Sequence, residues 1–236
     1  MKRFLTGFKA IFAGFRLLTQ PGIKRYVVLP LLINSLLFAS IIYLGAQTFN
    51  NWVDSIIPEW IAWLEWLIWP IFFILCLTVV FFLFSIVANL IASPFNGMLA
   101  EQAEYRLSTN KPVLTNKPLA QEVLDSVKSE ARKIQYFLFR GLPLLILFFI
   151  PVIQVFAPFI WFLFGAWMLA KEYLDYPMAN HGLHFQQQQN LIKQKRSLGF
   201  GFGVAVMGLT LIPIINFLAM PVAVCAATKL YVDEFA

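Results

Sequence analysis

The chain has 236 residues; 60% of them are hydrophobic, 13% are charged, and the mean hydropathy is +0.73. This composition places the chain among integral membrane proteins. The sequence contains no glycine-rich phosphate loop, no nucleophile elbow and no zinc-ligand spacing. These absences exclude a pump with its own ATPase and predict a protein that is not an enzyme and needs no cofactor and no metal.

Residues 1–18 are predicted to form an amphipathic helix. One arc of this helix carries Phe4, Phe8, Ile11, Phe12, Phe15 and Leu18, and the opposite arc carries Lys2, Lys9 and Arg16. An aromatic face opposite a basic face is typical of a helix that lies in the membrane interface and contacts anionic headgroups. The alternative is a helix packed on a partner subunit.

Two long apolar segments, residues 22–49 and 67–108, are expected to be transmembrane helices. The 34 uncharged residues from 67 to 100 are too many for one upright crossing, so the second helix is expected to tilt, kink at Ser93-Pro94 or project into the cytoplasm. Basic residues precede the first segment and reappear at Arg106, whereas the loop between the segments is purely acidic. The positive-inside rule therefore places this loop outside and both termini in the cytoplasm.

The polar residues 116–139 predict a cytoplasmic helix, with Asn116 as its cap and Pro118 in its first turn. Its apolar stripe consists of Val123, Val127, Ala131 and Ile134. The helix is expected to run along the bundle or against the headgroups.

Residues 141–170 and 199–229 are expected to form two re-entrant hairpins. Each stretch is apolar, has basic residues on both flanks and is broken near its middle by related sequences, IPVIQ at 150–154 and IPIIN at 212–216. The residues before the first break reach only ~15 Å as a helix, half of a ~30 Å hydrocarbon core. With equal basic flanks, the chain is expected to enter, turn at the proline and leave by the same face. Paired hairpin tips at membrane depth indicate a conduction or transport path.

Gly22, Lys24 and Arg25 form a candidate anion-binding site at the start of the first transmembrane helix. Unpaired backbone N–H groups at a helix start point at a bound anion, and the helix dipole adds about half a positive charge there. Glycine allows a close backbone approach, and the two cationic side chains strengthen the field. The alternative is that Lys24 and Arg25 only anchor the topology.

Four further polar residues are pore-lining candidates. Gln154 and Asn216 occupy matching positions just after the hairpin prolines, where an amide can line a pore or bond the carbonyls freed at the break. Glu101 and Glu104 lie one turn apart at the cytoplasmic end of the second span. They are either solvated helix-end charges or a gate that pairs with the cations of the first span.

Asp175, His181 and His184 invite a metal or acid–base interpretation, because the two histidines are three positions apart. Gly182 lies between the histidines, and the chain has no third histidine. A loop histidine is more often a surface or hydrogen-bonding residue than a ligand, so no metal site is expected.

Three sequences make the chain similar to the CysZ-type sulfate permease family of bacterial inner membranes. They are QPGIKRY at 20–26 leading into LPLLIN at 29–34, SPFNG at 93–97 with Glu101, and YLDYPMANHG at 173–182. The resemblance implies an all-α integral membrane protein with two true spans and two hemi-penetrating hairpins. It also implies an oligomer that admits sulfate to the cytoplasm for assimilation into cysteine.

In that family a glycine-leucine-arginine stretch before the first span is associated with sulfate binding. The resemblance places this stretch on Gly22, Ile23 and Lys24, with Arg25 next. Lys24 keeps the charge but lacks the planar fork that grips an oxyanion bidentately. Arg25 is therefore expected to supply that contact.

Together with the hairpins and the basic turn, the resemblance implies a homo-oligomeric, channel-like sulfate permease of the bacterial inner membrane, with sulfite as a further candidate substrate and no nucleic-acid partner. A dianion cannot enter hydrocarbon unaided, because even one charge at the bilayer centre is costly. The alternative is a membrane adaptor or scaffold without transport activity. A third hypothesis, an enzyme acting on lipid, depends on Asp175, His181 and His184.

Overall fold

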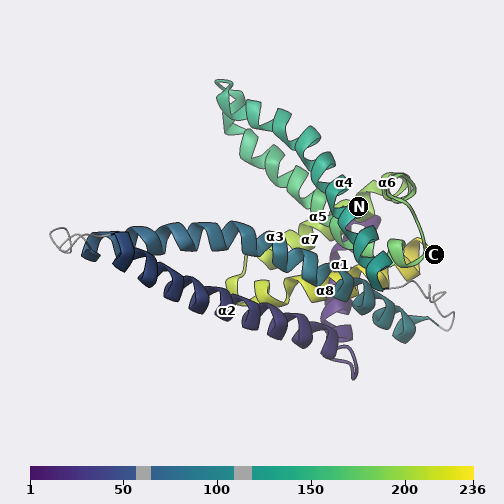
Figure 1. Cartoon of the computed structure of the whole chain (residues 1–236). Coiled ribbons are helices and arrows are strands. Elements are labelled where there is room, and N and C mark those ends of the chain that lie inside the picture. The colour runs from purple at the N-terminus through teal and green to yellow at the C-terminus, as the bar shows by residue number, and fades with distance from the viewer. Residues whose placement is uncertain (57–64, 109–118) are drawn as a thin grey trace. The chain divides into compact units, whose positions relative to one another are not determined.

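The computed structural model describes residues 1–56, 65–108 and 119–236 (Figure 1). The described residues form helices and short turns with no β-strand among them, which confirms the predicted all-helical fold. The chain divides into two compact units, Met1–Val27 with Pro94–Ala236 and, separately, Val28–Ser93. Much of the predicted acidic loop, and the predicted helix start at Asn116 and Pro118, lie outside the described residues.

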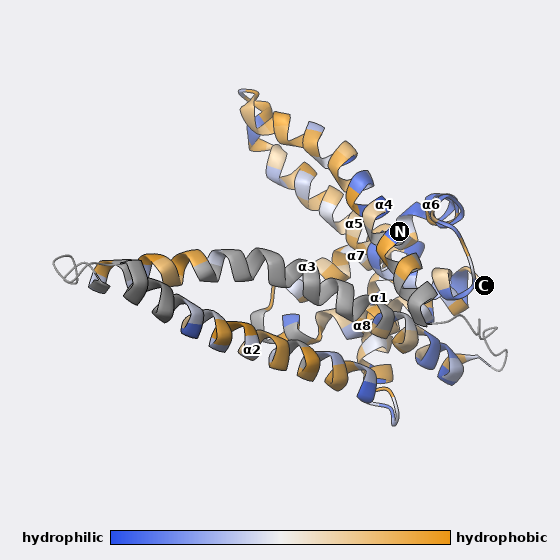
Figure 2. Cartoon of the chain, viewed as in Figure 1, coloured by the Kyte–Doolittle hydropathy of each residue, from blue (hydrophilic) through white to orange (hydrophobic). Residues whose placement is uncertain are grey.

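The smaller unit consists of most of α2 (Arg25–Ile56) and α3 (Glu65–Leu107). Within α2, the 24 residues Arg25–Thr48 have a mean hydropathy of 2.3 and are long enough to cross a membrane; no other helix in the described part of the chain meets this test. Leu36 and Leu44 are among the many apolar side chains of α2 that stay exposed. Many of the described residues of α2 are hydrophobic (Figure 2), and a large share of them are exposed.

The core of the larger unit is built from α1 (Lys2–Leu18), α5 (Ala157–Asn180), α7 (Arg196–Thr210) and α8 (Pro213–Glu234). Its largest fully buried side chains include Leu174, Met178, Leu198, Phe202, Val206 and Leu230. Small residues fill the rest, and every residue of the run VAVCAA at 222–227 is completely inaccessible. Such a run lets the neighbouring helices approach α8 closely.

α1 packs on α7 and α8 through a face of small residues. A Cβ at Gly7 would collide with the carbonyl of Leu198, and a Cβ at Gly14 with the carbonyl of Val222, so only glycine permits these approaches. The predicted aromatic arc splits between two environments, because Ile11 is buried whereas Phe12 is 65% exposed. The helix predicted at residues 1–18 is thus present, and its exposed side combines aromatic with basic residues.

The first predicted break coincides with a chain reversal. The hairpin runs through α4 (Leu119–Leu145), two short 3-10 turns, η2 (Ile146–Phe149) and η3 (Ile153–Val155), and then α5. Figure 1 shows α4 and α5 side by side, and the rings of Phe137 and Phe164, 5.6 Å apart, join them. The predicted cytoplasmic helix and the first arm of the hairpin are one helix, since Arg140 marks a change of composition and not a helix end.

The second predicted break also coincides with a reversal, because α7 ends at Thr210 and α8 begins at Pro213. A Cβ at Gly203 would collide with the carbonyl of Ala166, so α7 lies directly on α5. Between the hairpins, α6 (Phe185–Gln194) begins where the N–H of His184 donates to Oε1 of Gln187 at 2.8 Å. His184 therefore starts a helix in this structure.

Candidate anion-binding site

The candidate site lies in the turn between α1 and α2. Gly22 adopts φ +87°, a left-handed conformation that favours glycine, and lets the chain leave α1 and start α2 within a few residues. Ile23 is 1% exposed and belongs to the hydrophobic core of the larger unit, whereas Gly22, Lys24 and Arg25 are exposed. The buried isoleucine thus anchors a turn whose other residues face outwards.

Three backbone N–H groups of this turn are available to a ligand. The N–H of Ile23 donates to Gln20, that of Tyr26 to Ile23 and that of Val27 to Lys24. In the part of the chain that the structure describes, no backbone carbonyl accepts from the N–H of Gly22, Lys24 or Arg25. These are the donors that a helix start leaves for an anion.

A third cation reaches the turn from the end of α3. Nη2 of Arg106 donates to the carbonyl of Pro21 at 2.9 Å, and it lies 3.6 Å from where a Cβ of Gly22 would be. The bond satisfies a turn carbonyl and brings positive charge beside the glycine. Sequence reasoning used Arg106 only as a topology marker, because nothing in one sequence links positions 22 and 106.

The two predicted cations differ in their surroundings. Nη2 of Arg25 donates to the hydroxyl of Tyr26 at 2.9 Å, and its Cζ lies 4.8 Å from the centroid of that ring. Lys24 is exposed and forms no ion pair with any described residue. The charge of Lys24 is therefore not neutralised within the described chain, and Arg25 keeps donors that its bond to the tyrosine does not use.

The sequences SPFNG and YLDYPMANHG, far apart in the chain, meet in a seam between α3 and α5. Nδ2 of Asn96 contacts the hydroxyl of Tyr176 at 3.3 Å, and Nδ2 of Asn180 donates to the carbonyl of Gly97 at 2.9 Å. The structure thus gives these polar residues a shared role in fixing the end of α3 against α5.

Glu104 lies in the same seam. It is 3% exposed, its Oε1 lies 2.8 Å from Nε2 of His181, and its Oε2 accepts no hydrogen bond from a described residue. The His181 ring lies 4.9 Å from that of Tyr231, and burial together with the negative charge of Glu104 raises the pKa of Tyr231. Glu104 is therefore a buried partner of His181, and no ion pair joins it to Lys24 or Arg25 among the described residues.

The other pore-lining candidates are not brought together. Gln154 is exposed in η3 at the tip of the first hairpin, and Asn216 is exposed in the first turn of α8. Glu101 lies partly exposed on α3, one turn before Glu104. No hydrogen bond in the described part of the chain joins the two amides.

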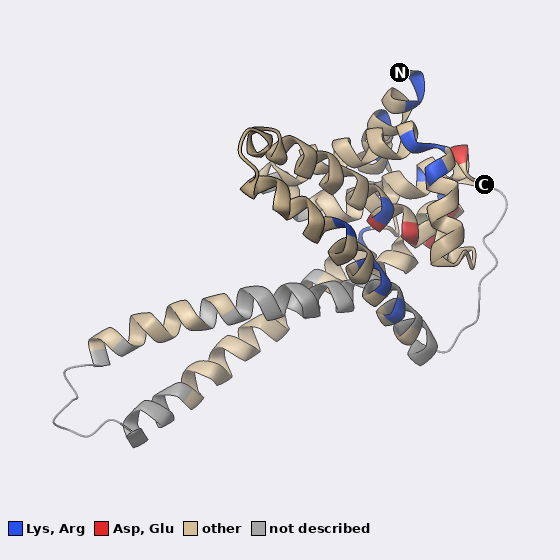
Figure 3. Cartoon of the chain, turned by 90° about the horizontal axis from the view of Figure 1, so that it is seen from above, with Lys and Arg blue, Asp and Glu red and all other residues tan. Residues whose placement is uncertain are grey.

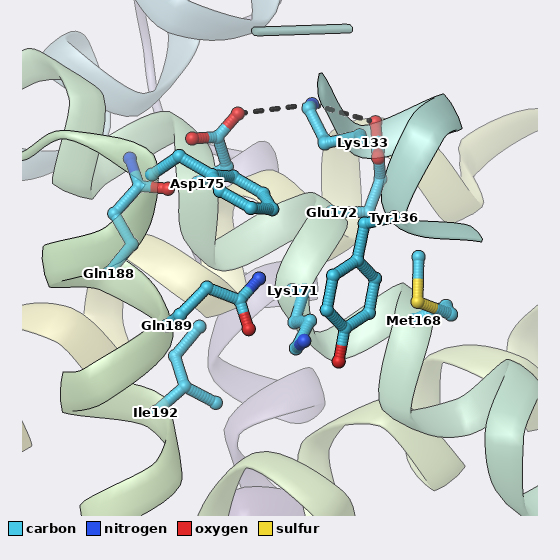
Figure 4. A pocket seen from close by; sticks show the side chains of 10 residues that line it. Lys133, Tyr136, Met168, Lys171, Glu172, Asp175, Gln188, Gln189 and Ile192 are labelled. Atoms are coloured by element: carbon cyan, nitrogen blue, oxygen red, sulfur yellow. Dashed lines mark hydrogen bonds and ion pairs between the residues drawn. The ribbon is translucent and has the colours of Figure 1, made fainter. Parts of the chain in front are cut away.

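Asp175 belongs to an ion-pair cluster at the base of the first hairpin (Figure 4). Nζ of Lys133 lies 3.0 Å from Asp175 and 3.3 Å from Glu172. Close by, Lys171 has a buried Nζ without a hydrogen-bond acceptor among the described residues, 3.6 Å from the centroid of the Tyr136 ring. Burial, followed by the charges of Lys193 and Arg140, lowers the pKa of Lys171 to about 7. No metal-binding group of histidine, cysteine and carboxylate side chains occurs among the described residues.

Comparison of the sequence with known proteins identifies its family. The family model described as Sulfate transporter CysZ/Etoposide-induced protein 2.4 matches residues 10–221. The chain belongs to this family. The Sulfate transporter CysZ of Pectobacterium atrosepticum is 43% identical over 98% of this chain and 86% of its own length, and that of Pseudomonas fluorescens is 41% identical over 98% and 94%. A third Sulfate transporter CysZ, from Pseudomonas syringae pv. tomato, is 43% identical over 98% and 93%.

The match to the Sulfate transporter CysZ family includes both polar regions described above. The turn at Gly22, the cation Arg106 and the pair of Glu104 with His181 all lie within residues 10–221. Tyr231, which stacks beside His181, lies beyond that match but within the nearly full-length similarity to the relatives.

Proposed function

We propose that the chain is a sulfate transporter of the bacterial inner membrane that admits sulfate to the cytoplasm for cysteine biosynthesis. One observation carries the proposal: an exposed turn combines three free backbone N–H groups with Lys24, Arg25 and Arg106, in a chain 41–43% identical to proteins named sulfate transporters. The substrate is sulfate, and sulfite, which is also a sulfur oxyanion, is a second candidate.

The turn binds sulfate through complementary charge and hydrogen bonding. Sulfate carries two charges and only acceptor atoms, so it gains from donors that are already fixed in place and pays little to organise them. The N–H groups of Gly22, Lys24 and Arg25 supply such donors, and Ile23 holds the turn to the core. Lys24 neutralises charge as a point cation, and Arg25 offers the planar fork.

The proposed membrane arrangement is based on where the chain exposes apolar residues. α2 and α3 are the two spans, and the α4–α5 and α7–α8 hairpins enter the bilayer and return to the cytoplasmic face. This placement is supported by the exposed apolar residues at the first tip, including Phe149 and Val152, and by the absence of charged residues from 141 to 170. α1 lies in the interface with Phe8 and Phe12 towards lipid, and both termini are cytoplasmic.

Several copies of the chain form a channel-like passage. Hairpins that do not cross leave polar backbone at membrane depth, which neighbouring subunits must cover. Gln154 and Asn216 at the tips line this passage, and Glu101 with Glu104 flank its cytoplasmic end. Because Glu104 is buried and bonded to His181, its carboxylate is less exposed to a passing anion.

Sulfate uptake by purified protein in liposomes tests the proposal. We expect the wild type to accumulate sulfate and the double variant Lys24→Ala/Arg25→Ala to lose most uptake. The control Lys128→Ala/Arg132→Ala removes two exposed cations from α4 and is expected to transport normally. Absence of uptake by the wild type contradicts the proposal and favours a membrane adaptor without transport activity.

The passage itself is tested separately from the binding turn. Replacing both Gln154 and Asn216 with leucine is expected to reduce sulfate flux while sulfate binding at the turn stays at the wild-type level. Unchanged sulfate flux in this variant would show that the two amides do not line the passage.

A further inference from the structure

A cavity of about 510 Å³ lies in the larger unit, away from the turn at Gly22. Its polar wall consists of Arg140, Lys193, Arg196 and Ser197, and aromatic side chains from α1, α4, α5 and α7, among them Trp167, form the rest. A Cβ at Gly201 would collide with the carbonyl of Phe4, so this glycine lets α1 close one side of the cavity. The volume falls in the range of ligand pockets for small organic molecules.

The cavity carries positive charge on Arg140, Lys193 and Arg196. No acidic residue lines it, and among the described residues none of Arg140, Lys193 and Arg196 pairs with a carboxylate. Arg196 and Ser197 are the first residues of α7, where unpaired N–H groups and the helix dipole add to the field. Three cations at one concave surface favour the binding of an anion there.

A buried cation adjoins the same cavity. Lys171 is 5% exposed, and its Nζ has no hydrogen-bond acceptor among the described residues. Its Nζ lies 3.6 Å from the ring centroid of Tyr136 and 5.3 Å from that of Trp167, and both rings line the cavity. Figure 4 shows Lys171 beside Tyr136. A buried ammonium without a hydrogen-bond acceptor is costly, and a bound anion nearby would lower this cost.

The surroundings of the cavity indicate what kind of anionic ligand it binds. Arg140 is the last charged residue before the uncharged residues 141–170, and its neighbours Phe139 and Leu142 are 74% and 56% exposed. In Figure 3 the tip of this hairpin carries no Lys, Arg, Asp or Glu. On α1, Leu5 next to the cavity-lining Phe4 is 46% exposed. The cationic wall therefore adjoins apolar surface, as a lipid headgroup site requires, because the phosphate and the acyl chains need different surroundings.

We propose that this cavity binds the phosphate group of an anionic phospholipid, with Arg140, Lys193 and Arg196 around the phosphate and the acyl chains along the exposed apolar residues of α4 and α1. The inference rests on the proposed insertion of the α4–α5 hairpin into the bilayer. The cavity is larger than a single inorganic oxyanion needs, and its aromatic walls suit a glycerol backbone better than a free ion. The bound lipid holds α1 and α7 against the base of the first hairpin.

Native mass spectrometry of the full-length protein tests this site with phosphatidylglycerol and, as the neutral comparison, phosphatidylcholine. Wild type is expected to retain phosphatidylglycerol selectively. Removing two cations in Arg140→Gln/Lys193→Gln is expected to weaken its binding by about 30-fold, since each cation at a membrane surface contributes about fivefold. The matched control Lys128→Gln/Arg132→Gln is expected to bind the lipid like wild type.

Several results would overturn the proposal. The first is that Arg140→Gln/Lys193→Gln binds phosphatidylglycerol as well as wild type does. The second is that the control Lys128→Gln/Arg132→Gln loses as much phosphatidylglycerol binding as Arg140→Gln/Lys193→Gln. Displacement of the lipid by inorganic phosphate at the same concentration would assign the cavity to a free anion. A thermal unfolding scan without anionic lipid checks that the variant folds; its midpoint is expected near that of wild type, because both side chains are exposed.

The lipid-binding proposal and the transport proposal can fail independently of each other. Sulfate uptake by Arg140→Gln/Lys193→Gln is expected to persist in liposomes, and loss of sulfate binding in this variant would assign the cavity to the sulfate route and contradict a lipid site. Selective lipid binding by a wild type that shows no sulfate uptake would contradict transport alone and support the lipid site.

Discussion

Arg106 and Pro21, 85 positions apart in the sequence, are joined by a 2.9 Å hydrogen bond from the guanidinium to the backbone carbonyl. The bond ties the end of α3 to the turn that precedes α2 and places a cation beside the exposed N–H groups of that turn. The candidate sulfate site is therefore built from two separate parts of the sequence, and its geometry depends on how the end of α3 packs.

Replacing Arg106 with glutamine is expected to weaken sulfate binding by about tenfold, since one charge-assisted hydrogen bond is lost and the turn loosens. Arg106→Lys keeps the charge without the fork and is expected to bind at an intermediate level. Isothermal titration with sulfate measures both. Arg132→Gln, on α4, serves as control, and wild-type affinity in Arg106→Gln would contradict this role.

Gly22→Ala is expected to destabilise the protein by about 1–2 kcal/mol and to weaken sulfate binding, because φ +87° is strained for a residue with a Cβ. The thermal unfolding midpoint and a sulfate titration report the two effects. Gly208→Ala is the matched control, since a Cβ there meets no atom within 4 Å. Equal behaviour of the two variants would show that the turn does not need its left-handed glycine.

His181→Ala is expected to destabilise the fold by about 1–3 kcal/mol, because it leaves Glu104 buried with no partner on either oxygen. His181→Gln retains a donor and is expected to recover part of the loss. Unfolding midpoints in detergent measure both changes. If His181→Ala unfolds like wild type, the contact does not support the seam between α3 and α5.

Lys171 predicts a pH dependence of stability. Its pKa is about 7 in the folded protein and 10.5 without burial, so between these values the unfolded chain binds the extra proton. The contribution of Lys171 to stability therefore rises as the pH increases from about 7 to about 10.5, and its cost is greatest below about 7.

Lys171→Met is accordingly expected to be more stable than wild type at about pH 6, and the difference is expected to shrink as the pH rises. Unfolding midpoints in neutral detergent across this range provide the measurement. Lys128→Met, at an exposed position of α4, is expected to show no such trend. A pH-independent difference between Lys171→Met and wild type would contradict a burial cost at Lys171.

The local features of the fold were predictable because they depend on neighbouring residues. Pro151 and Pro213 cannot continue the hydrogen bonding of a preceding helix, and the chain reverses at both. The continuity of α4 through Arg140 was not predictable from composition, because a helix can pass from polar to apolar surroundings without a break. The packing of α1 through its glycines was not predicted. A search for apolar periodicity scores phenylalanine as hydrophobic but does not score glycines such as Gly7.

The site was only partly predictable for a related reason. Gly22, Lys24 and Arg25 are contiguous, so their combination could be read directly from the sequence. Arg106 and the partner of Glu104 come from distant segments, and a single sequence carries no signal that pairs them. The cavity at Arg140 likewise requires α4, α6 and α7 to meet, which only the folded chain reveals.

Equilibrium titration of sulfate against purified protein is the most direct test of the central claim that the turn before α2 binds sulfate. Wild type and the control Lys128→Ala/Arg132→Ala are expected to bind with the same affinity, and Lys24→Ala/Arg25→Ala to bind at least about tenfold more weakly. Undiminished sulfate binding by Lys24→Ala/Arg25→Ala would contradict the claim and place the substrate elsewhere.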